Sequence, residues 1–324
     1  MRHRAAVSHP AEPAPGAFPN RAVLLFLATR PAFLSVTLVA CLIGLACAHR
    51  SGASIDWTTA VFTLLFALVA HAGVNVINDY HDAESGADAA NTKRLFPFTG
   101  GSRFIQNGVL SAAETGLFGY ALLAAVVPAG LWLAWQAGAG LIVIGIAGLF
   151  VGWAYSAPPL KLMSRGLGEL AIALGWLAVV VGTDYVQRGS FSVLPFAAGV
   201  SYALLVANLL FINQFPDHDG DAAAGKLTLV VRLGPQIAKW GYLLIAILSY
   251  TWLVAMVTIH ALPQYAAAAA MTLILSFTAA RELIADASAP DELAAPIKRT
   301  ILATNVHGLL LAATLAFAQS GISA

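Results

Sequence analysis

Long apolar runs dominate this sequence, and their number and length constrain the fold more than any other feature. A helix that crosses a membrane needs ~20 mostly apolar residues. Runs near this length lie at about 31–49, 57–77, 115–135, 139–156, 168–187, 192–213, 237–258, 262–285 and 299–319. Only 10% of the residues are charged, too few to cover a soluble globule. The sequence therefore predicts an all-α polytopic membrane bundle of about nine transmembrane helices.

We expect this bundle to form a single domain over residues 21–324. Residues 1–20 are rich in Ala, Pro and His and lack a long apolar run. Such a composition cannot bury enough apolar surface to order the backbone. We therefore expect residues 1–20 to form a disordered tail.

The basic residues predict an orientation. If the first helix starts on the inside, only Arg50 and Arg188 of the 17 Lys and Arg residues lie in outside loops. Loops that stay in the cytoplasm carry an excess of Lys and Arg. The distribution predicts a protein of the cell inner (cytoplasmic) membrane with its N-terminus in the cytoplasm.

Two polar segments follow apolar runs on that same side, at about residues 79–113 and 214–236. They hold seven of the 16 acidic residues, namely Asp79, Asp82, Glu84, Asp88, Asp217, Asp219 and Asp221. The strings "INDYHD" and "INQFPD" share the pattern I-N-x-x-x-D at the ends of the second and sixth runs. This similarity suggests a weak internal duplication that places one acidic site in each half of the bundle.

If the helices continue through these strings, Asn78 and Asp82 share one helix face, and Asn213, Asp217 and Asp221 share another. Asp88 follows Gly86, where we expect the helix to break. Two such acidic faces at one end of a bundle repel each other unless cations are bound. Oxygen ligands of this kind suit Mg²⁺, which typically takes one or two carboxylates together with water and substrate phosphate. The pattern predicts a Mg²⁺ and diphosphate site in which the metal activates the leaving group of an allylic C–O bond.

Basic and aromatic residues lie near the same face. Arg30, Arg103 and Lys161 are the best candidates to neutralise a diphosphate and its departing charge. Tyr155 ends the fourth run and could face a developing carbocation through its ring. Lys and Arg residues that only set topology, and a Tyr at the membrane interface, would look the same in the sequence.

Two other interpretations must be weighed. Asn and Asp commonly cap helices and populate loops, but two matching motifs at the ends of apolar runs favour a shared site. Intramembrane carboxylates can also mark a cation transporter or channel. Against this, the acidic residues cluster at one membrane face and do not continue through the spans.

The two motifs resemble those of the UbiA superfamily of intramembrane prenyltransferases. The family pattern N-D-x-x-D is matched by Asn78, Asp79 and Asp82, and N-x-x-x-D-x-x-x-D by Asn213, Asp217 and Asp221. The first motif, N-D-Y-x-D-x-x-x-G-x-D, is most similar to the MenA-type 1,4-dihydroxy-2-naphthoate polyprenyltransferases. The string "YSAPPLKL" is similar instead to chlorophyll synthases.

The resemblance implies Mg²⁺-dependent transfer of a polyprenyl group from its diphosphate to an aromatic acceptor, with diphosphate release. The implied acceptor is 1,4-dihydroxy-2-naphthoate in menaquinone biosynthesis, with 4-hydroxybenzoate, homogentisate or a chlorophyllide-like ring as alternatives. We expect the metal to be held by Asn78, Asp82, Asp88, Asp217 and Asp221. We expect the diphosphate to be bound by Asn78, Arg30, Arg103, Lys161 and Asn213. The catalytic residues would be Asp82, Asp217, Asp221, Tyr155 and Lys161.

Overall fold

The computed structural model describes residues 11–317, which form helices joined by turns and loops, without a strand in that range. The elements in order are α1 (Arg21–Ala28), η1 (Pro31–Leu34), α2 (Ser35–Arg50), α3 (Trp57–Ser85), α4 (Ala87–Ala90), α5 (Ala112–Ala137), α6 (Gly140–Ser156), η2 (Leu162–Arg165), α7 (Gly168–Arg188), α8 (Val193–Ala223), α9 (Leu229–Leu233), α10 (Pro235–Thr258), η3 (Gln264–Thr272), α11 (Leu273–Asp286), η4 (Pro290–Glu292) and α12 (Ala294–Phe317).

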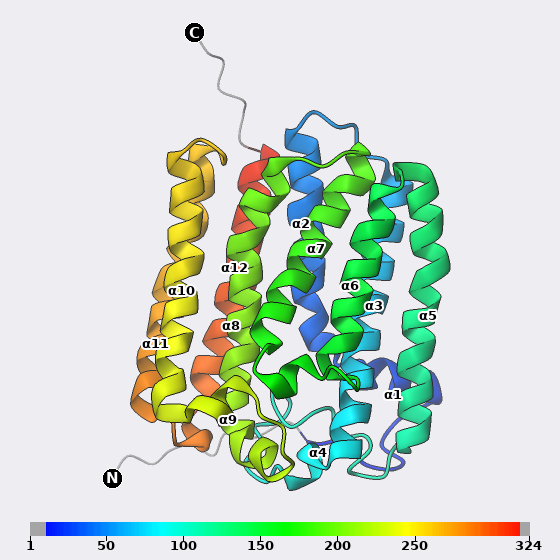
Figure 1. The fold of residues 1–324 in the computed structure, drawn as a ribbon, viewed down its shortest axis with the longest axis vertical. Coiled ribbons are helices and arrows are strands. Elements are labelled where there is room, and N and C mark those ends of the chain that lie inside the picture. Colours follow the sequence, from blue (N-terminus) through cyan, green and yellow to red (C-terminus); the bar gives the residue numbers. More distant parts are fainter. Residues whose placement is uncertain (1–10, 318–324) are drawn as a thin grey trace.

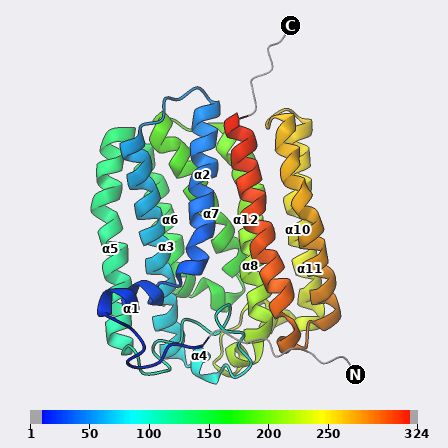
Figure 2. The same cartoon turned by 180° about the vertical axis from the view of Figure 1, so that it is seen from behind.

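The long helices run side by side as one bundle, with α1 lying across one end (Figure 1, Figure 2). Within residues 11–317, eight helical segments are long and apolar enough to cross a membrane, and α6 is a shorter apolar helix of 17 residues. All nine expected runs coincide with these helices. The prediction of an all-α multi-pass membrane bundle is therefore confirmed. The last two residues of the run at 299–319 lie outside the described residues, as do residues 1–10 of the expected tail.

Three helical segments differ from the predicted runs, two at their ends and one at its start. The runs at 57–77 and 192–213 continue as helix to Ser85 and Ala223, so that both acidic motifs lie on helices and not in loops. The run at 262–285 begins with the 3₁₀ segment η3 before α11. Hydropathy marks only the part of a helix that faces apolar surroundings, so it misses turns that continue among polar partners.

Helices pack closely at the centre of the bundle, where α2, α7, α8 and α12 meet. Tyr202 on α8 is fully buried, and its hydroxyl donates a hydrogen bond to the Val36 carbonyl at 2.7 Å. A Cβ added to Gly308 on α12 would lie 2.2 Å from a methyl group of Val39 and 2.5 Å from the Tyr202 ring. Small residues commonly allow such close approach in membrane bundles.

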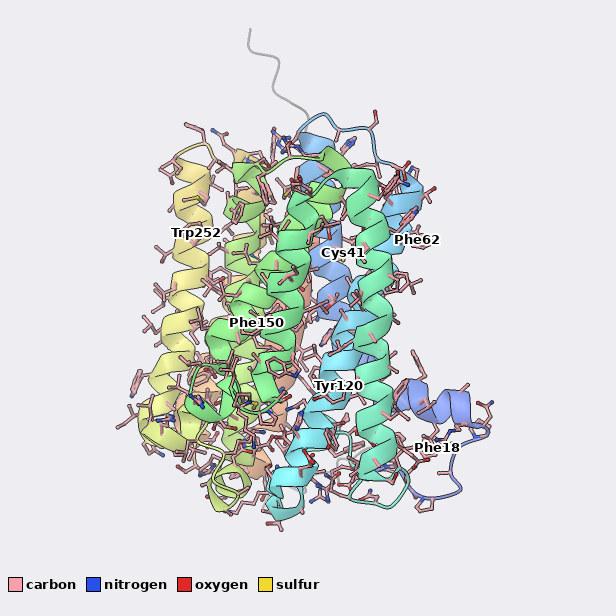
Figure 3. The ribbon with its side chains drawn as sticks, turned by 45° about the vertical axis from the view of Figure 1, so that its right-hand side comes forward. Phe18, Cys41, Phe62, Tyr120, Phe150 and Trp252 are labelled. Atoms are coloured by element: carbon pink, nitrogen blue, oxygen red, sulfur yellow. The ribbon has the colours of Figure 1, made fainter. Side chains whose placement is uncertain are left out.

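The outer surface of the bundle is apolar. Phe62 on α3, Phe150 on α6 and Trp135 on α5 are exposed side chains, and the first two are marked in Figure 3. Large apolar side chains exposed on many helices are what a lipid-facing surface requires.

The acidic motifs, α4 and α9 all lie at one end of the bundle, the lower end in Figure 1. Arg50 and Arg188 end α2 and α7, and Arg188 donates to the Ser51 hydroxyl across 3.5 Å. These two basic residues therefore share one end of the bundle, opposite the acidic motifs, as the alternation of spans predicts.

The described part of the N-terminal segment, residues 11–20, lies against the same end. Glu12 pairs with Arg94 at 2.7 Å, and the Phe18 ring stacks on Phe104 with centroids 5.3 Å apart. Asn20 then caps α1 by accepting a hydrogen bond from the Val23 amide.

Candidate active site

The first motif occupies the last turns of α3. Asn78 and Asp82 share one face there, and the Asn78 amide donates to Asp82 Oδ2 at 3.1 Å. Gly86, at a φ of 80°, ends the helix as expected. Asp88 then lies in the short helix α4 and is buried.

The second motif occupies the last turns of α8, so Asn213, Asp217 and Asp221 share a face as predicted. After Ala223 the chain turns through Gly225, and the Lys226 amide donates to the Asp221 carbonyl at 2.8 Å. This turn directs the Lys226 side chain back toward the motifs.

Lys226 joins the two motifs. Its ammonium lies 2.8 Å from Asp82 Oδ2 on α3 and 3.5 Å from Asp221 Oδ1 on α8. Lys226 is 8% exposed. The nearby acidic side chains of Asp79, Asp82, Asp88 and Asp221 are similarly buried, and that of Asp217 is half-buried. The two motifs, far apart in the sequence, therefore form one polar cluster.

Asn91 and residues 100–102 form one wall of this cluster. Asn91 donates to Asp217 Oδ1, and the Gly100 amide donates to Asp217 Oδ2 at 3.2 Å. The Ser102 amide lies 3.2 Å from Asp79 Oδ2. Backbone and amide donors thus orient two carboxylates without adding positive charge.

Two predicted cations reach the cluster, and one does not. Arg30 Nη1 lies 3.8 Å from Asp79 Oδ1, and Arg103 Nη1 donates to the Asp88 carbonyl at 2.6 Å. Among the described residues, Lys161 forms no ion pair with an acidic side chain.

The backbone at these three basic residues is unusual. Between residues 11 and 317, four residues other than glycine have a positive φ, and three of them are Arg30, Arg103 and Lys161. A side chain in this region is uncommon and is held there by its surroundings. The predicted diphosphate cations therefore coincide with strained backbone positions.

Charges in the cluster perturb one another. Burial, with Asp82 and Asp79 nearby, raises the pKa of Asp88 well above its usual range. Burial alone lowers the pKa of Lys226, but the attraction of Asp221 and Asp82 outweighs it and raises that pKa well above the usual range. Lys226 therefore remains charged, while the raised pKa means that the Asp88 carboxyl holds its proton more tightly.

The oxygen atoms of the cluster suit a hard cation. Asp221 Oδ2, Asn213 Oδ1 and Asn91 Oδ1 are buried without a hydrogen-bond partner. No group of three or more His, Cys, Asp or Glu residues in the described chain is gathered closely enough to hold a metal ion. Lys226 contacts Asp82 Oδ2 and Asp221 Oδ1, while Asn91 and the Gly100 amide donate to the two oxygens of Asp217.

A large apolar cavity of about 360 Å³ lies between α3, α5, α6 and α7. Tyr155, on the last turn of α6, lines it, as do His71 and Trp176. The few polar groups on its wall include His71, whose Nδ1 lies 2.8 Å from the Thr37 hydroxyl. Such a cavity can hold a long hydrocarbon chain.

The structure therefore brings together Asn78, Asp82, Asp88, Asp217 and Asp221, and it places Arg30 and Arg103 beside them. Lys226 and Asn91 were not predicted. Lys226 lies in the string "GKLTLVVRLG", which follows the second acidic motif and is similar to sequences of the UbiA superfamily, and this was a signal that could have pointed to it. Asn91 had no local signal, because its partner Asp217 is 126 positions away in the sequence.

Comparison with known proteins adds to this geometry. The sequence model of the UbiA prenyltransferase family matches residues 22–302. A 2-carboxy-1,4-naphthoquinone phytyltransferase of Synechocystis sp. is 32% identical over 233 residues, which are 70% of this chain and 71% of that protein. A 1,4-dihydroxy-2-naphthoate octaprenyltransferase of Mycobacterium tuberculosis is 33% identical over 57% of this chain and 62% of that protein.

The fold has solved counterparts. A UbiA homolog from Archaeoglobus fulgidus, solved bound to DMAPP and Mg²⁺, has a TM-score of 0.63 at 18% identity, covering 89% of this chain and 99% of that one. A UbiA homolog from Aeropyrum pernix, solved without ligand, has the same TM-score at 17% identity. Both agree with the helical bundle described above.

Proposed function

This chain belongs to the UbiA prenyltransferase family, and from that premise we propose that it transfers a polyprenyl group from its diphosphate to an aromatic acceptor. The observation that carries the proposal is the meeting of two acidic motifs at one end of a bundle that also holds a large apolar cavity, lined in part by Tyr155. A diphosphate bound with a divalent cation needs the first feature, and an isoprenoid tail needs the second.

The residues of the cluster fit Mg²⁺, because oxygen atoms of Asp221, Asn213 and Asn91 are buried and unpartnered. Asn78, Asp82, Asp88, Asp217 and Asp221 would hold the metal, which when bound neutralises the diphosphate and makes it a better leaving group. The Archaeoglobus fulgidus homolog was solved bound to DMAPP and Mg²⁺, which supports a divalent metal beside the prenyl diphosphate.

The basic residues stabilise the departing charge. Arg30 and Arg103 present guanidinium groups next to the acidic cluster, and Lys161 immediately precedes η2. As the allylic C–O bond breaks, negative charge grows on the diphosphate and positive charge on the prenyl carbon. Fixed cations beside the first of these charges lower the barrier without reorganising.

The prenyl tail occupies the apolar cavity, and Tyr155 faces the allylic end of the tail. Tyr155 is buried and lies at the cluster's end of α6. Its ring stabilises positive charge on the prenyl carbon, and the apolar walls keep water from quenching it.

The acceptor we propose is 1,4-dihydroxy-2-naphthoate, used to make menaquinone. The printed activities of the Synechocystis and Mycobacterium tuberculosis relatives support a naphthoate-type ring. We further propose the cell inner (cytoplasmic) membrane as the location, with the site facing the cytoplasm, since 15 of the 17 Lys and Arg residues fall on that side of the predicted topology.

The test is a membrane assay with Mg²⁺, a labelled polyprenyl diphosphate and a panel of acceptors: dihydroxynaphthoate, 4-hydroxybenzoate, homogentisate and chlorophyllide. Asp82→Ala and Asp217→Ala each remove an oxygen ligand, and we expect loss of product by at least ~10²-fold. Asp219→Ala is the matched control, because Asp219 lies on the same helix but its exposed carboxylate pairs with Lys93.

Transfer to dihydroxynaphthoate that survives in Asp219→Ala and is lost in the other two variants is the expected result. Full transfer by Asp82→Ala and Asp217→Ala would refute the proposed site. Transport of a cation across vesicles without any prenylated product would favour the transporter interpretation instead.

A further inference from the structure

Lys226 is fixed by its backbone in a position that points into the acidic cluster. Its amide donates to the Asp221 carbonyl at 2.8 Å, and its own carbonyl accepts from the Thr228 amide at 2.9 Å. The side chain beyond this anchored turn has four rotatable methylene groups, so the ammonium can move while the backbone stays in place.

The ammonium occupies carboxylate oxygens from both motifs. Asp82 Oδ2 accepts from Lys226 and also from Asn78, and Asp221 Oδ1 lies 3.5 Å from the same ammonium. These carboxylates are two of those proposed above to hold the metal. Lys226 and a divalent cation therefore compete for the same oxygens.

The charge balance of the cluster gives Lys226 a second role. Asp79, Asp82, Asp88 and Asp221 are all buried, and Asp217 lies among them on α8. Buried like charges at this density repel strongly unless a cation lies between them. Lys226 supplies such a cation from within the chain.

We propose that Lys226 is a tethered cation that changes partners during the reaction. In the metal-free protein it bridges Asp82 and Asp221 and holds the two halves of the site together. When a prenyl diphosphate binds with Mg²⁺, Lys226 leaves the carboxylates and its ammonium donates to diphosphate oxygens. This inference rests on the proposed function, because it requires that the site bind a diphosphate.

The proposal predicts effects of opposite sign when the charge is removed. Without diphosphate, the ammonium competes with a divalent ion, so Lys226→Met should bind the ion more tightly. With diphosphate, the ammonium is a ligand, so the same variant should bind the diphosphate more weakly. A lysine that only holds the fold together would weaken both.

Purified full-length protein in detergent allows both measurements. Binding of Mn²⁺ alone is followed by electron paramagnetic resonance, and binding of geranyl diphosphate with saturating Mg²⁺ by calorimetry. For Lys226→Met we expect Mn²⁺ affinity to rise and geranyl diphosphate affinity to fall, each by roughly tenfold, the size of one charge-assisted hydrogen bond.

Two further variants make the comparison specific. Lys226→Gln keeps a donor for Asp82 and loses the charge, and we expect the same two signs. Lys93→Met is the control, because Lys93 forms an exposed ion pair with Asp219 outside the cluster; both affinities should stay as in the unmodified protein.

Several outcomes would overturn the inference. Weaker binding of both Mn²⁺ and geranyl diphosphate, or no change in either, would refute the exchange of partners. Variants at Lys226 that fold neither with nor without Mg²⁺ would make Lys226 a fixed structural cross-link. If the unmodified protein bound Mn²⁺ but no geranyl diphosphate, the proposed function itself would fail, and this inference with it.

Discussion

Replacing Gly101 by Ala should disable the site by moving carboxylates that the substitution does not alter chemically. Gly101 lies in the wall of the cluster at a φ of 72°. A Cβ built on it would lie 2.4 Å from Asp88 Oδ2 and 3.1 Å from Asp79 Oδ1. The Ala methyl group and the two carboxylates therefore cannot keep their present positions together.

The size of the effect follows from two contributions. A side chain in the left-handed region costs about 1–2 kcal/mol of stability. A carbon and an oxygen normally stay about 3.3 Å apart, so the Asp88 carboxylate must move by about 1 Å. A displacement of about 1 Å in a catalytic site can lower the rate by about 10²-fold, and we expect Gly101→Ala to lose prenyl transfer by about that factor.

Gly108→Ala separates the two contributions. Gly108 lies in the same loop at a φ of 68°, but a Cβ there would meet nothing within 4 Å. Both variants should lose a similar amount of thermal stability from backbone strain, and Gly101→Ala should in addition lose Mg²⁺-dependent diphosphate binding and transfer. Equal activity in the two variants, or a full loss in both, would refute the reasoning.

Two other predictions concern the cavity and the N-terminal segment. Gly148 lines the cavity with open space at its Cβ, so Gly148→Leu should weaken binding of long prenyl diphosphates by roughly tenfold or more. Dimethylallyl diphosphate, whose tail is short, should bind to this variant as tightly as to the unmodified protein when measured by calorimetry. Weaker binding of both the long and the short diphosphate would contradict the prediction that the long tail occupies the cavity. The Glu12 side chain accepts from Arg94, which lowers the pKa of Glu12, so its pairing stabilises residues 11–20 above about pH 4.3 and is lost as the pH falls through the lowered value. Hydrogen exchange of this segment, corrected for intrinsic rates, should therefore rise in Glu12→Gln at pH 7. In the unmodified protein it should rise as the pH falls through the lowered pKa of Glu12. Unchanged exchange in both cases would contradict this.

The fold was predictable because it follows from hydropathy. In a bilayer the backbone must satisfy its own hydrogen bonds, so an apolar run of sufficient length becomes a helix. The exceptions have local causes. The last turns of α3 and α8 continue among polar partners such as Lys226 and Asn91, which a hydropathy pattern does not register.

The pairing of the motifs was also predictable, because matching spacing at corresponding helix ends places both on one side of the bundle. The loop residues were not. Lys161 was expected beside the diphosphate and Lys226 was not predicted to lie in the site. The structure places Lys226 between the motifs and leaves Lys161 without an ion pair in the described chain. Which way a basic side chain points after a turn depends on the turn geometry, and spacing along the sequence does not determine it.

The carboxylates of the acidic cluster have two kinds of partner, namely neutral hydrogen-bond donors and the charged Lys226. Asp217 is oriented by the Gly100 amide and by Asn91, neither of which carries a charge, and Asp79 takes the neutral Ser102 amide at 3.2 Å with the Arg30 guanidinium farther away, at 3.8 Å. These donors fix direction while the carboxylates keep their attraction for a cation. A charged partner on every carboxylate would neutralise the site and lower its affinity for a metal and diphosphate. Lys226 lies on the two carboxylates that join the motifs, where a movable charge can hold the empty site together and still yield to the substrate.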